Sequence, residues 1–346
     1  MVRSAQRTLR FFGLNPGERA LLALPVHYIA GKMMVVRALA GGTTTIQGWP
    51  AANRRPANHL VRNADDVRVA REVFEEAGGR GGIVAKIERA EALDGIDDVI
   101  TAADAIMIAR GDLGVEIGDA ELPAVQKDLI KRARAMNCVV ITATQMMESM
   151  IVNAMPTRAE VSDVANAVLD GTDAVMLSGE TAAGKHPVQV VKAMSRICES
   201  AEQHPRAKIS DHRMALTFGR VDEAIAMATM YTANHLGVKA IAALTESGST
   251  TLWMSRISSG IPIYALTSHV ETRRKVTLYR GVYPVSFEPT GKDHSEINRE
   301  AVDELLRRGT VRDGDLVILT KGDLMGQMGG TNAMKIVRVG ELAGDQ

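Results

Sequence analysis

The sequence predicts an α/β protein built from two units, each with a sheet of mostly parallel strands. Within residues 65–205, apolar runs of strand length alternate four times with amphipathic helical segments, and the connections are short. A second series of strands and helices over residues 214–346 has the spacing of an open, mostly parallel sheet. Polar residues gather where the strands of the first series end, which is where parallel α/β proteins place their sites.

The first series opens with a helix whose apolar face follows helical spacing and which ends at Gly78 and Gly79. Thr157 precedes Glu160 by three residues, and this capping box starts the helix at residue 158. The other elements that we expect here are strands over 83–87, 105–109, 138–142 and 174–177, and helices from about 90, over 122–136 and over 187–201.

The second series follows residues 204–213, where the periodicity lapses and we expect a linker between domains. The elements expected after it are helices over 221–235, 271–279 and 295–308, a helix opened by residues 245–251, and strands over 240–244, 263–266, 316–320 and 335–339.

The composition is that of an ordinary globular protein, with 46% apolar and 24% charged residues in a chain of 346. Basic and acidic residues both number 41, so the charge gives no support for a nucleic-acid or acidic-membrane partner. Cys138 and Cys198 lie in apolar or helical runs, which favours two thiols in a reducing compartment over a disulfide. No apolar run is long enough to cross a bilayer, and we expect a soluble cytoplasmic protein.

Residues 1–64 differ from the rest of the chain in composition, because they contain many basic residues and only one acidic residue, Glu18. Pro25 interrupts a strand-like run, and residues 41–56 have no apolar period. An arginine-rich, acid-poor start is also typical of a transit peptide, for which residues 1–14 would qualify. The pattern assigns no fold to this leader.

Charged residues follow the first two strands of the first series. Lys86 and Glu88 lie two positions apart and project from one face of a strand, and Asp112 follows Gly111 just past the next apolar run. A lysine and two carboxylates at neighbouring strand ends can hold a metal ion and an anion. The alternative is a buried ion pair, which for Lys-x-Glu alone is the commoner structure. Polar residues after the next two strands, at 143–145 and 178–180, favour a site.

Four long stretches of the sequence closely resemble pyruvate kinase of the bacterial type. They are IVAKIE over residues 83–88, IMIARGDLGVEI over 106–117, ITATQMMESM over 141–150 and PTRAEVSDVANAVLDG over 156–171. The resemblance covers the chain from about residue 65 to its end. It implies the last four βα units of a TIM-type barrel, followed by a C-terminal α/β domain of the effector-binding type.

The resemblance also implies phosphoryl transfer from phosphoenolpyruvate to ADP, giving pyruvate and ATP, as in the last step of glycolysis. Glu88 and Asp112 would be ligands of Mg²⁺ or Mn²⁺, and Lys86 would balance charge on the phosphoryl group and the enolate oxygen. Thr144 would contact the substrate near the carbon that is protonated. Gly111 and Asp112 would begin a helical turn whose free N–H groups hold the substrate carboxylate.

Structural alternatives stay open beside these roles. Thr144 could be a strand-end or helix cap, and Arg110 is as well suited to an ion pair beside the site as to ligand contact. Arg158 is better suited to a helix start or a subunit contact than to substrate. The methionines of the third stretch are expected to fill the core, namely Met146, Met147 and Met150.

In the second domain, residues 245–250 resemble the family's effector loop, which binds the phosphate of a sugar phosphate or nucleotide. The residues that would bind it are Thr245, Ser247, Gly248 and Thr250, because hydroxyls and N–H groups at a helix start suit a phosphate. A plain helix cap with a turn explains the same residues. The loop contains no lysine or arginine, so the effector's identity is left open.

The sequence departs from the family before residue 65. The family's barrel has eight strands, an Arg-x-Asn-x-Ser element, an Asp-Thr pair that completes a K⁺ site, and a lid domain over the nucleotide. Residues 1–64 contain none of these, and the match begins abruptly, as after a reading-frame error or gene truncation, which argues against a transit peptide. The predicted domains are therefore an unassigned leader over 1–64, a partial barrel over 65–205 and an effector-type domain over 214–346.

From this departure we expect little or no kinase activity from the chain by itself, and a homo-oligomer if it folds. One alternative is a catalytically inactive remnant that binds a phosphate ligand or assembles through its second domain. Another is a different metal-dependent barrel enzyme, such as an aldolase, but that class explains neither residues 142–145 nor the second domain.

Overall fold

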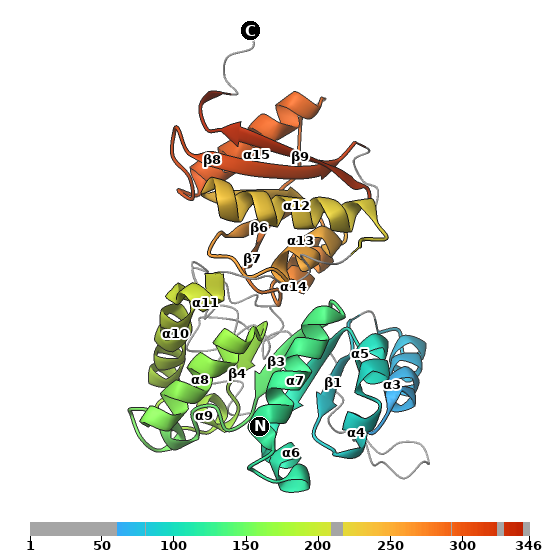
Figure 1. The fold of residues 1–346 in the computed structure, drawn as a ribbon, viewed down its shortest axis with the longest axis vertical. Coiled ribbons are helices and arrows are strands. Elements are labelled where there is room, and N and C mark those ends of the chain that lie inside the picture. The colour runs from blue at the N-terminus through green and yellow to red at the C-terminus, as the bar shows by residue number, and fades with distance from the viewer. Residues whose placement is uncertain (1–60, 80, 209–216, 292, 324–328, 342–346) are drawn as a thin grey trace. The chain divides into compact units, whose positions relative to one another are not determined.

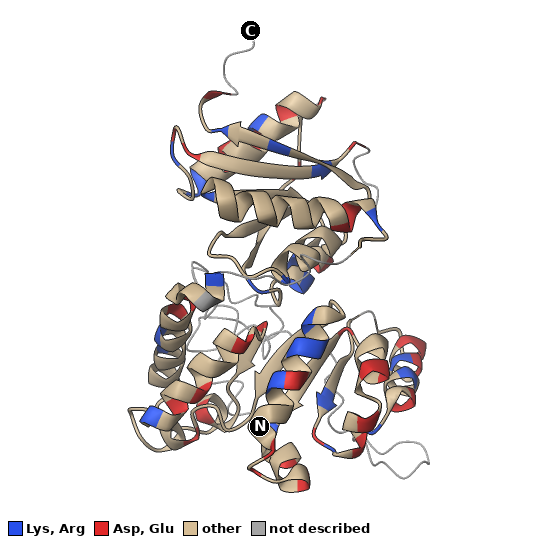
Figure 2. Ribbon diagram, in the orientation of Figure 1, with Lys and Arg blue, Asp and Glu red and all other residues tan. Residues whose placement is uncertain are grey.

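The computed structural model describes residues 61–79, 81–208, 217–291, 293–323 and 329–341 (Figure 1). The predicted leader, apart from its last residues, and half of the predicted linker lie outside them. The chain divides between Ala201 and Glu202 into two compact units, and each is described by itself. Acidic and basic residues are interspersed along the helices of both units (Figure 2). No helix among the described residues is long and apolar enough to span a membrane.

The first unit contains a four-stranded parallel sheet in the order β1-β2-β3-β4, as the alternating pattern predicts. Its strands are β1 (Val84–Ile87), β2 (Ala105–Ala109), β3 (Val139–Ala143) and β4 (Ala174–Met176). Its helices are α3 (Ala64–Glu76), α4 (Glu91–Asp94), α5 (Ile96–Ala102), α6 (Arg110–Ile117), α7 (Leu122–Ala135), η3 (Glu148–Ile151), α8 (Arg158–Asp170), α9 (Gly179–Ala182) and α10 (Pro187–Gln203).

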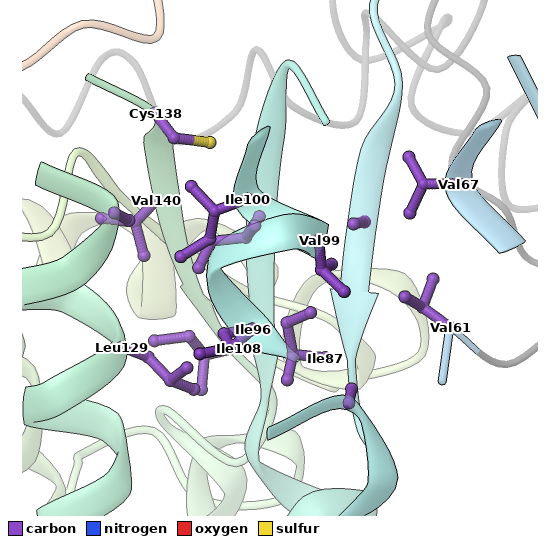
Figure 3. Packing of buried hydrophobic residues seen from close by; sticks show 14 of the residues in the cluster. Val61, Val67, Ile87, Ile96, Val99, Ile100, Ile108, Leu129, Cys138 and Val140 are labelled. Atoms are coloured by element: carbon purple, nitrogen blue, oxygen red, sulfur yellow. The ribbon is translucent and has the colours of Figure 1, made fainter. Parts of the chain in front are cut away.

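Helices pack on one face of this sheet. Ile87, Ile108 and Val140 lie on that face and join a buried cluster with α3, α5 and α7, in which Ile96, Ile108 and Leu129 lie together (Figure 3). A second cluster packs α8 and α10 against Val175. Helices on one face of a parallel sheet are the arrangement of a βα barrel, and the strand register places Lys86 on the opposite face.

Helix ends in this unit follow the local chemistry of the sequence. Asn63 caps α3 by accepting hydrogen bonds from two backbone N–H groups of the first turn. The predicted capping box between Thr157 and Glu160 is confirmed at the start of α8. Helix α8 ends at Gly171, which has a φ of 97° that favours glycine.

The second unit contains a five-stranded sheet in the order β7-β6-β5-β8-β9, in which only the β8–β9 pair is antiparallel. Its strands are β5 (Ala240–Leu244), β6 (Ile263–Thr267), β7 (Val282–Ser286), β8 (Leu316–Gly322) and β9 (Thr331–Arg338). Its helices are α11 (Pro205–Lys208), α12 (Val221–Leu236), α13 (Ser249–Ser255), α14 (Val270–Val276) and α15 (His294–Arg307). The predicted open, mostly parallel sheet is confirmed.

Strand β7 is the strand that the sequence pattern missed. Its segment is short and contains Pro284, and a proline within an apolar run argues against a central strand. The structure places β7 at the edge of the sheet, paired in parallel with β6. An edge strand pairs on one side only, so its proline need not donate to a neighbouring strand.

Candidate active site at the strand ends of the first unit

The residues predicted for the active site come together at the carboxyl ends of β1, β2 and β3. Lys86 lies on β1 and Glu88 directly follows that strand. Asp112 lies in the first turn of α6, which begins at the residue after β2, and Thr144 directly follows β3. Parallel strands end at one edge of their sheet, so residues from three separate stretches of sequence meet there.

Two carboxylates converge on the ammonium of Lys86. Its Nζ forms an ion pair with Glu88 Oε2 and lies 3.6 Å from Asp112 Oδ2. Glu88 is 5% exposed, whereas the Asp112 side chain is 71% exposed. The site thus has one carboxylate at its base, one at its mouth and a cation between them.

These two carboxylates fit a divalent metal ion of the Mg²⁺ type. Glu88 Oε2 is shielded from water and its contact among the described residues is the ion pair with Lys86, so a metal ion would share this oxygen with the ammonium or displace it. Mg²⁺ prefers oxygen ligands and is commonly held by one or two carboxylates, with water and substrate oxygens completing its shell. The part of the chain that the structure describes contains no group of three or more histidine, cysteine or acidic side chains that could form a closed cage.

The hydroxyl of Thr144 joins the end of β3 to the start of α6. Thr144 Oγ1 donates to the carbonyl of Ala143 at 2.6 Å and accepts from the backbone N–H of Gly111 at 2.8 Å. The expectation that this N–H is free is therefore wrong, because the Thr144 hydroxyl engages it. A substrate carboxylate that reaches Gly111 has to share or replace this hydrogen bond.

Arg110 is buried beside the site, and its guanidinium is fully engaged in structural contacts. It donates to the carbonyls of Thr144 and Gln145 at distances from 2.9 to 3.2 Å. It also pairs with Asp163 Oδ1 at 2.6 Å and donates to Gln126 Oε1 at 3.3 Å. Of the two roles left open by the sequence, the structure shows the ion pair.

Two buried or half-buried glutamates hold the segment that follows Thr144. Glu180, which is 1% exposed, accepts hydrogen bonds from the backbone N–H groups of Met147 and Ser178. Glu160 accepts from the N–H and hydroxyl of Ser149 and from those of Thr157. These contacts tie the β3–α8 connection to α8 and α9.

The core role expected of Met146, Met147 and Met150 is confirmed, since all three side chains are fully buried.

The environment of Glu160 lowers its pKa. Burial by itself raises the pKa of this carboxyl, but the hydrogen bonds from Ser149 and Thr157 favour the ionised form more strongly. Glu160 therefore serves both as the capping-box residue of α8 and as a charged hydrogen-bond acceptor that holds η3.

Arg158, the first residue of α8, is exposed.

In the second unit, the four predicted effector residues lie between β5 and the first turn of α13. Thr245 Oγ1 accepts from the N–H of Gly248, whose φ of 82° suits glycine. The hydroxyls of Ser247 and Ser249 are 2.8 Å apart, and those of Thr250 and Thr331 are also 2.8 Å apart. The hydroxyls thus bond to the loop itself and to the start of β9.

Sequence reasoning missed two residues that shape the site, Gln126 and Asp163, and it missed the structural role of Glu180. Asp163 is separated from Arg110 by 53 residues, and no local spacing links the two. Glu180 was noted as a polar residue at a strand end, but its role as an acceptor for Met147 depends on the path of the chain. The charges of Asp163 and Glu180 are the signal that could have marked these two residues, whereas Gln126 carries no charge.

Two profiles of known protein families match the chain. The one described as pyruvate kinase, barrel domain, matches residues 57–191, and the one described as pyruvate kinase, alpha/beta domain, matches residues 223–337. The first range contains the four-stranded sheet and every predicted active-site residue. The second contains the five-stranded sheet, apart from the last residue of β9, and the loop at Thr245.

Curated relatives carry the same description. The chain is 55% identical over 282 residues to a pyruvate kinase of Buchnera aphidicola, covering 80% of this chain and 59% of the relative. It is 56% identical over 282 residues to pyruvate kinase II of Salmonella typhimurium, covering 80% and 58%. With a pyruvate kinase of Bacillus licheniformis the identity is 44% over 291 residues, covering 83% and 49%. The chain therefore spans between about half and three fifths of the length of these relatives.

Proposed function

The chain belongs to the pyruvate kinase family, and we propose that its first unit carries the metal- and phosphoenolpyruvate-binding residues of a pyruvate kinase site. The reaction is phosphoryl transfer from phosphoenolpyruvate to ADP, with pyruvate and ATP as products. The observation that supports it is the convergence of Lys86, Glu88 and Asp112 at one edge of a parallel sheet. The proposed domains are the partial barrel over 65–205 and the effector-type domain over 214–346.

Glu88 and Asp112 are the proposed ligands of Mg²⁺ or Mn²⁺. When bound, such an ion neutralises negative charge on the phosphoryl and enolate oxygens. Family members also use K⁺, but the sequence of this chain lacks the Arg-x-Asn-x-Ser element and the Asp-Thr pair of that site.

Lys86 is the proposed catalytic cation. Its ammonium lies on the sheet face opposite the helices, next to both proposed metal ligands. There it would stabilise charge on the phosphoryl group during transfer and on the enolate oxygen afterwards. A lysine suits this role because its flexible stem lets one point charge follow the substrate.

Thr144 is proposed to contact the substrate carboxylate together with Gly111 and Asp112, and to take part in protonating the enolate. Its hydroxyl proton points to the carbonyl of Ala143, and the group accepts a hydrogen bond from Gly111. A relay through Thr144 therefore requires the hydroxyl to rotate away from Ala143, since an alcohol is too weak an acid to donate by itself.

We expect slow turnover or none from this polypeptide alone. The sequence lacks the arginine that would balance the phosphoryl charge and the residues of the K⁺ site. Loss of one such electrostatic contact commonly lowers the rate by about 10²–10³.

A binding measurement and an assay together test the proposal on the full chain. We expect Mn²⁺-dependent binding of phosphoenolpyruvate, measured by calorimetry, that is lost in Lys86→Ala and retained in the surface variant Lys127→Ala. Absence of such binding in the wild-type chain contradicts the proposed site. A coupled assay of pyruvate formation with Mg²⁺, K⁺ and ADP tests the turnover, and a rate typical of enzymes, about 1–10³ s⁻¹, contradicts the expected low activity.

A second candidate function is binding of a sugar phosphate or nucleotide by the second unit without catalysis. The hydroxyls of Thr245, Ser247 and Thr250, which lie between β5 and the first turn of α13, support it. Calorimetric titration with ribose 5-phosphate and with AMP, using Ser247→Ala as the variant and Ser286→Ala on the exposed end of β7 as the control, tests this function. No binding by the wild-type chain contradicts it for these two ligands.

The proposed cellular setting is the cytoplasm, and the proposed assembly is a homo-oligomer. Cys138 and Cys198 are both buried and are not joined in a disulfide, which suits a reducing compartment. Sedimentation of the purified chain over a range of concentrations tests the assembly, and a monomer throughout that range contradicts it.

A further inference from the structure

Two consecutive residues beside the proposed substrate have left-handed backbones. Thr144 has a φ of 65° and Gln145 a φ of 53°. This region is unfavourable for residues with a side chain, and a β-branched threonine is rare in it. Such a pair persists only where the surrounding contacts hold it in place.

The guanidinium of Arg110 supplies these contacts. Its Nε and Nη2 both donate to the carbonyl of Thr144, and Nη2 also donates to that of Gln145. Nη1 donates to Asp163 and Gln126, so all three nitrogens are engaged. Arg110 is 6% exposed, and a planar charged fork in a buried position forms stronger and more directed hydrogen bonds than at the surface.

Arg110 and its neighbour Gly111 hold Thr144 from two sides. The guanidinium binds the Thr144 carbonyl, while the Gly111 N–H binds the Thr144 hydroxyl at 2.8 Å. Because Arg110 and Gly111 are consecutive residues of α6, one short segment sets both the backbone and the side chain of Thr144. A change in the backbone at 144 would therefore move the hydroxyl away from Gly111.

We propose that Arg110 is a positioning residue, which keeps Thr144 and Gln145 left-handed and thereby fixes the Thr144 hydroxyl against the Gly111 N–H, while Asp163 of α8 orients the guanidinium. The inference about geometry stands on these contacts. Its catalytic consequence rests on the proposed function, since it requires that Thr144 and Gly111 meet the substrate.

The conservative variant Arg110→Lys separates positioning from charge. A lysine retains a cation for Asp163 but has no planar fork to reach two carbonyls at once. We expect hydrogen exchange at the Gly111 amide of the full chain, measured by NMR, to become about tenfold faster, because a left-handed backbone is disfavoured by about that factor per residue. Arg132→Lys, on the exposed face of α7, is the matched control and should leave this amide unchanged.

Rescue by glycine tests the mechanism directly. Glycine adopts a left-handed backbone without strain, so Gln145→Gly in the Arg110→Lys chain should restore most of the protection at Gly111. A merely structural ion pair between Arg110 and Asp163 predicts no such rescue. If Arg110→Lys alone does not fold, recovery of folding in the double variant supports the proposal and failure to recover contradicts it.

Unchanged exchange at Gly111 in folded Arg110→Lys overturns the positioning role, whatever the chain catalyses. If the wild-type chain binds no phosphoenolpyruvate, the proposed function fails while the exchange and rescue results still decide this inference. If it does bind, Arg110→Lys should weaken that binding by about tenfold and Gln145→Gly should restore it.

Discussion

Lys86 and Glu88 form an ion pair at the carboxyl end of β1, in which the carboxylate is 5% exposed and the ammonium also lies 3.6 Å from Asp112. The cation therefore occupies the space between the two proposed metal ligands. A divalent ion that binds there has to displace the ammonium or share the carboxylates with it.

This relationship predicts that Lys86→Met binds Mn²⁺ more tightly than the wild-type chain in the absence of substrate. The variant leaves Glu88 and Asp112 without their cation, so the metal no longer competes with it. We expect an affinity gain of roughly tenfold by electron paramagnetic resonance, in keeping with one unit charge near a partly buried site. Lys127→Met, on the exposed side of α7, is the control, and equal or weaker binding by Lys86→Met contradicts the competition.

The bridge from Thr144 to Gly111 predicts different effects of two substitutions. Thr144→Val keeps the branched shape but removes the hydroxyl, so the Gly111 N–H loses its acceptor. We expect a loss of about 1–3 kcal/mol in the free energy of unfolding, measured with urea. Thr144→Ser retains the hydroxyl and should lose less, and equal losses in the two variants would show that the hydrogen bond contributes nothing.

The contacts of Glu160 predict that the free energy of unfolding of the chain declines in acid. Its pKa is lowered in the folded chain, so it stabilises the fold above the pKa of an unfolded glutamate and loses this effect as the pH falls through the lowered value. Glu160→Gln should cost about 2 kcal/mol at pH 7, because the carboxylate accepts hydrogen bonds from Ser149 and Thr157. The difference from wild type should shrink below pH 4 in thermal unfolding.

The exposed Glu148, in the same connection, provides the control. Glu148→Gln should leave both the stability at pH 7 and its acid dependence close to those of the wild-type chain. A difference between Glu160→Gln and wild type that stays constant from pH 7 to pH 3 contradicts the role given to the ionised carboxylate.

The burial of Lys321 predicts that removing its ammonium group stabilises the fold. Burial lowers its pKa, the like charge of Lys335 lowers it further, and Asp323 and Asp293 raise it in part. The fold thus disfavours the charged form, so the cost is present at neutral pH and disappears as the pH rises through the lowered pKa. Lys321→Met should raise the free energy of unfolding at pH 7, by up to about 1 kcal/mol, despite losing the bond to the His294 carbonyl.

Urea unfolding at pH 7 and at pH 10 checks this prediction, and the advantage of Lys321→Met should be smaller at the higher pH. Lys335→Met, which removes only the repulsion, should give a smaller gain at pH 7. A less stable Lys321→Met chain would show that the hydrogen bond to His294 outweighs the burial of the charge.

The sequence predicted the four strands and most of the longer helices of the first unit, because its strands are apolar runs of similar length and these helices carry a periodic apolar face. It predicted β6 but not its neighbour β7, since Pro284 is compatible with a strand only at an edge, and an edge is defined by strand order. The candidate site was predictable in its charged members, because parallel strands bring their ends to one side of a sheet.

The sequence by itself determined the alternation of strands and helices, the capping box at Thr157, and the charges that follow β1 and β2, all of which depend on neighbours within a few residues. Only the tertiary structure decided that Arg110 pairs with Asp163, that Thr144 is left-handed, and that its hydroxyl engages Gly111. These features depend on contacts between segments far apart in the chain, and the free energy of a buried charge or a strained backbone is set by the groups that surround it after folding.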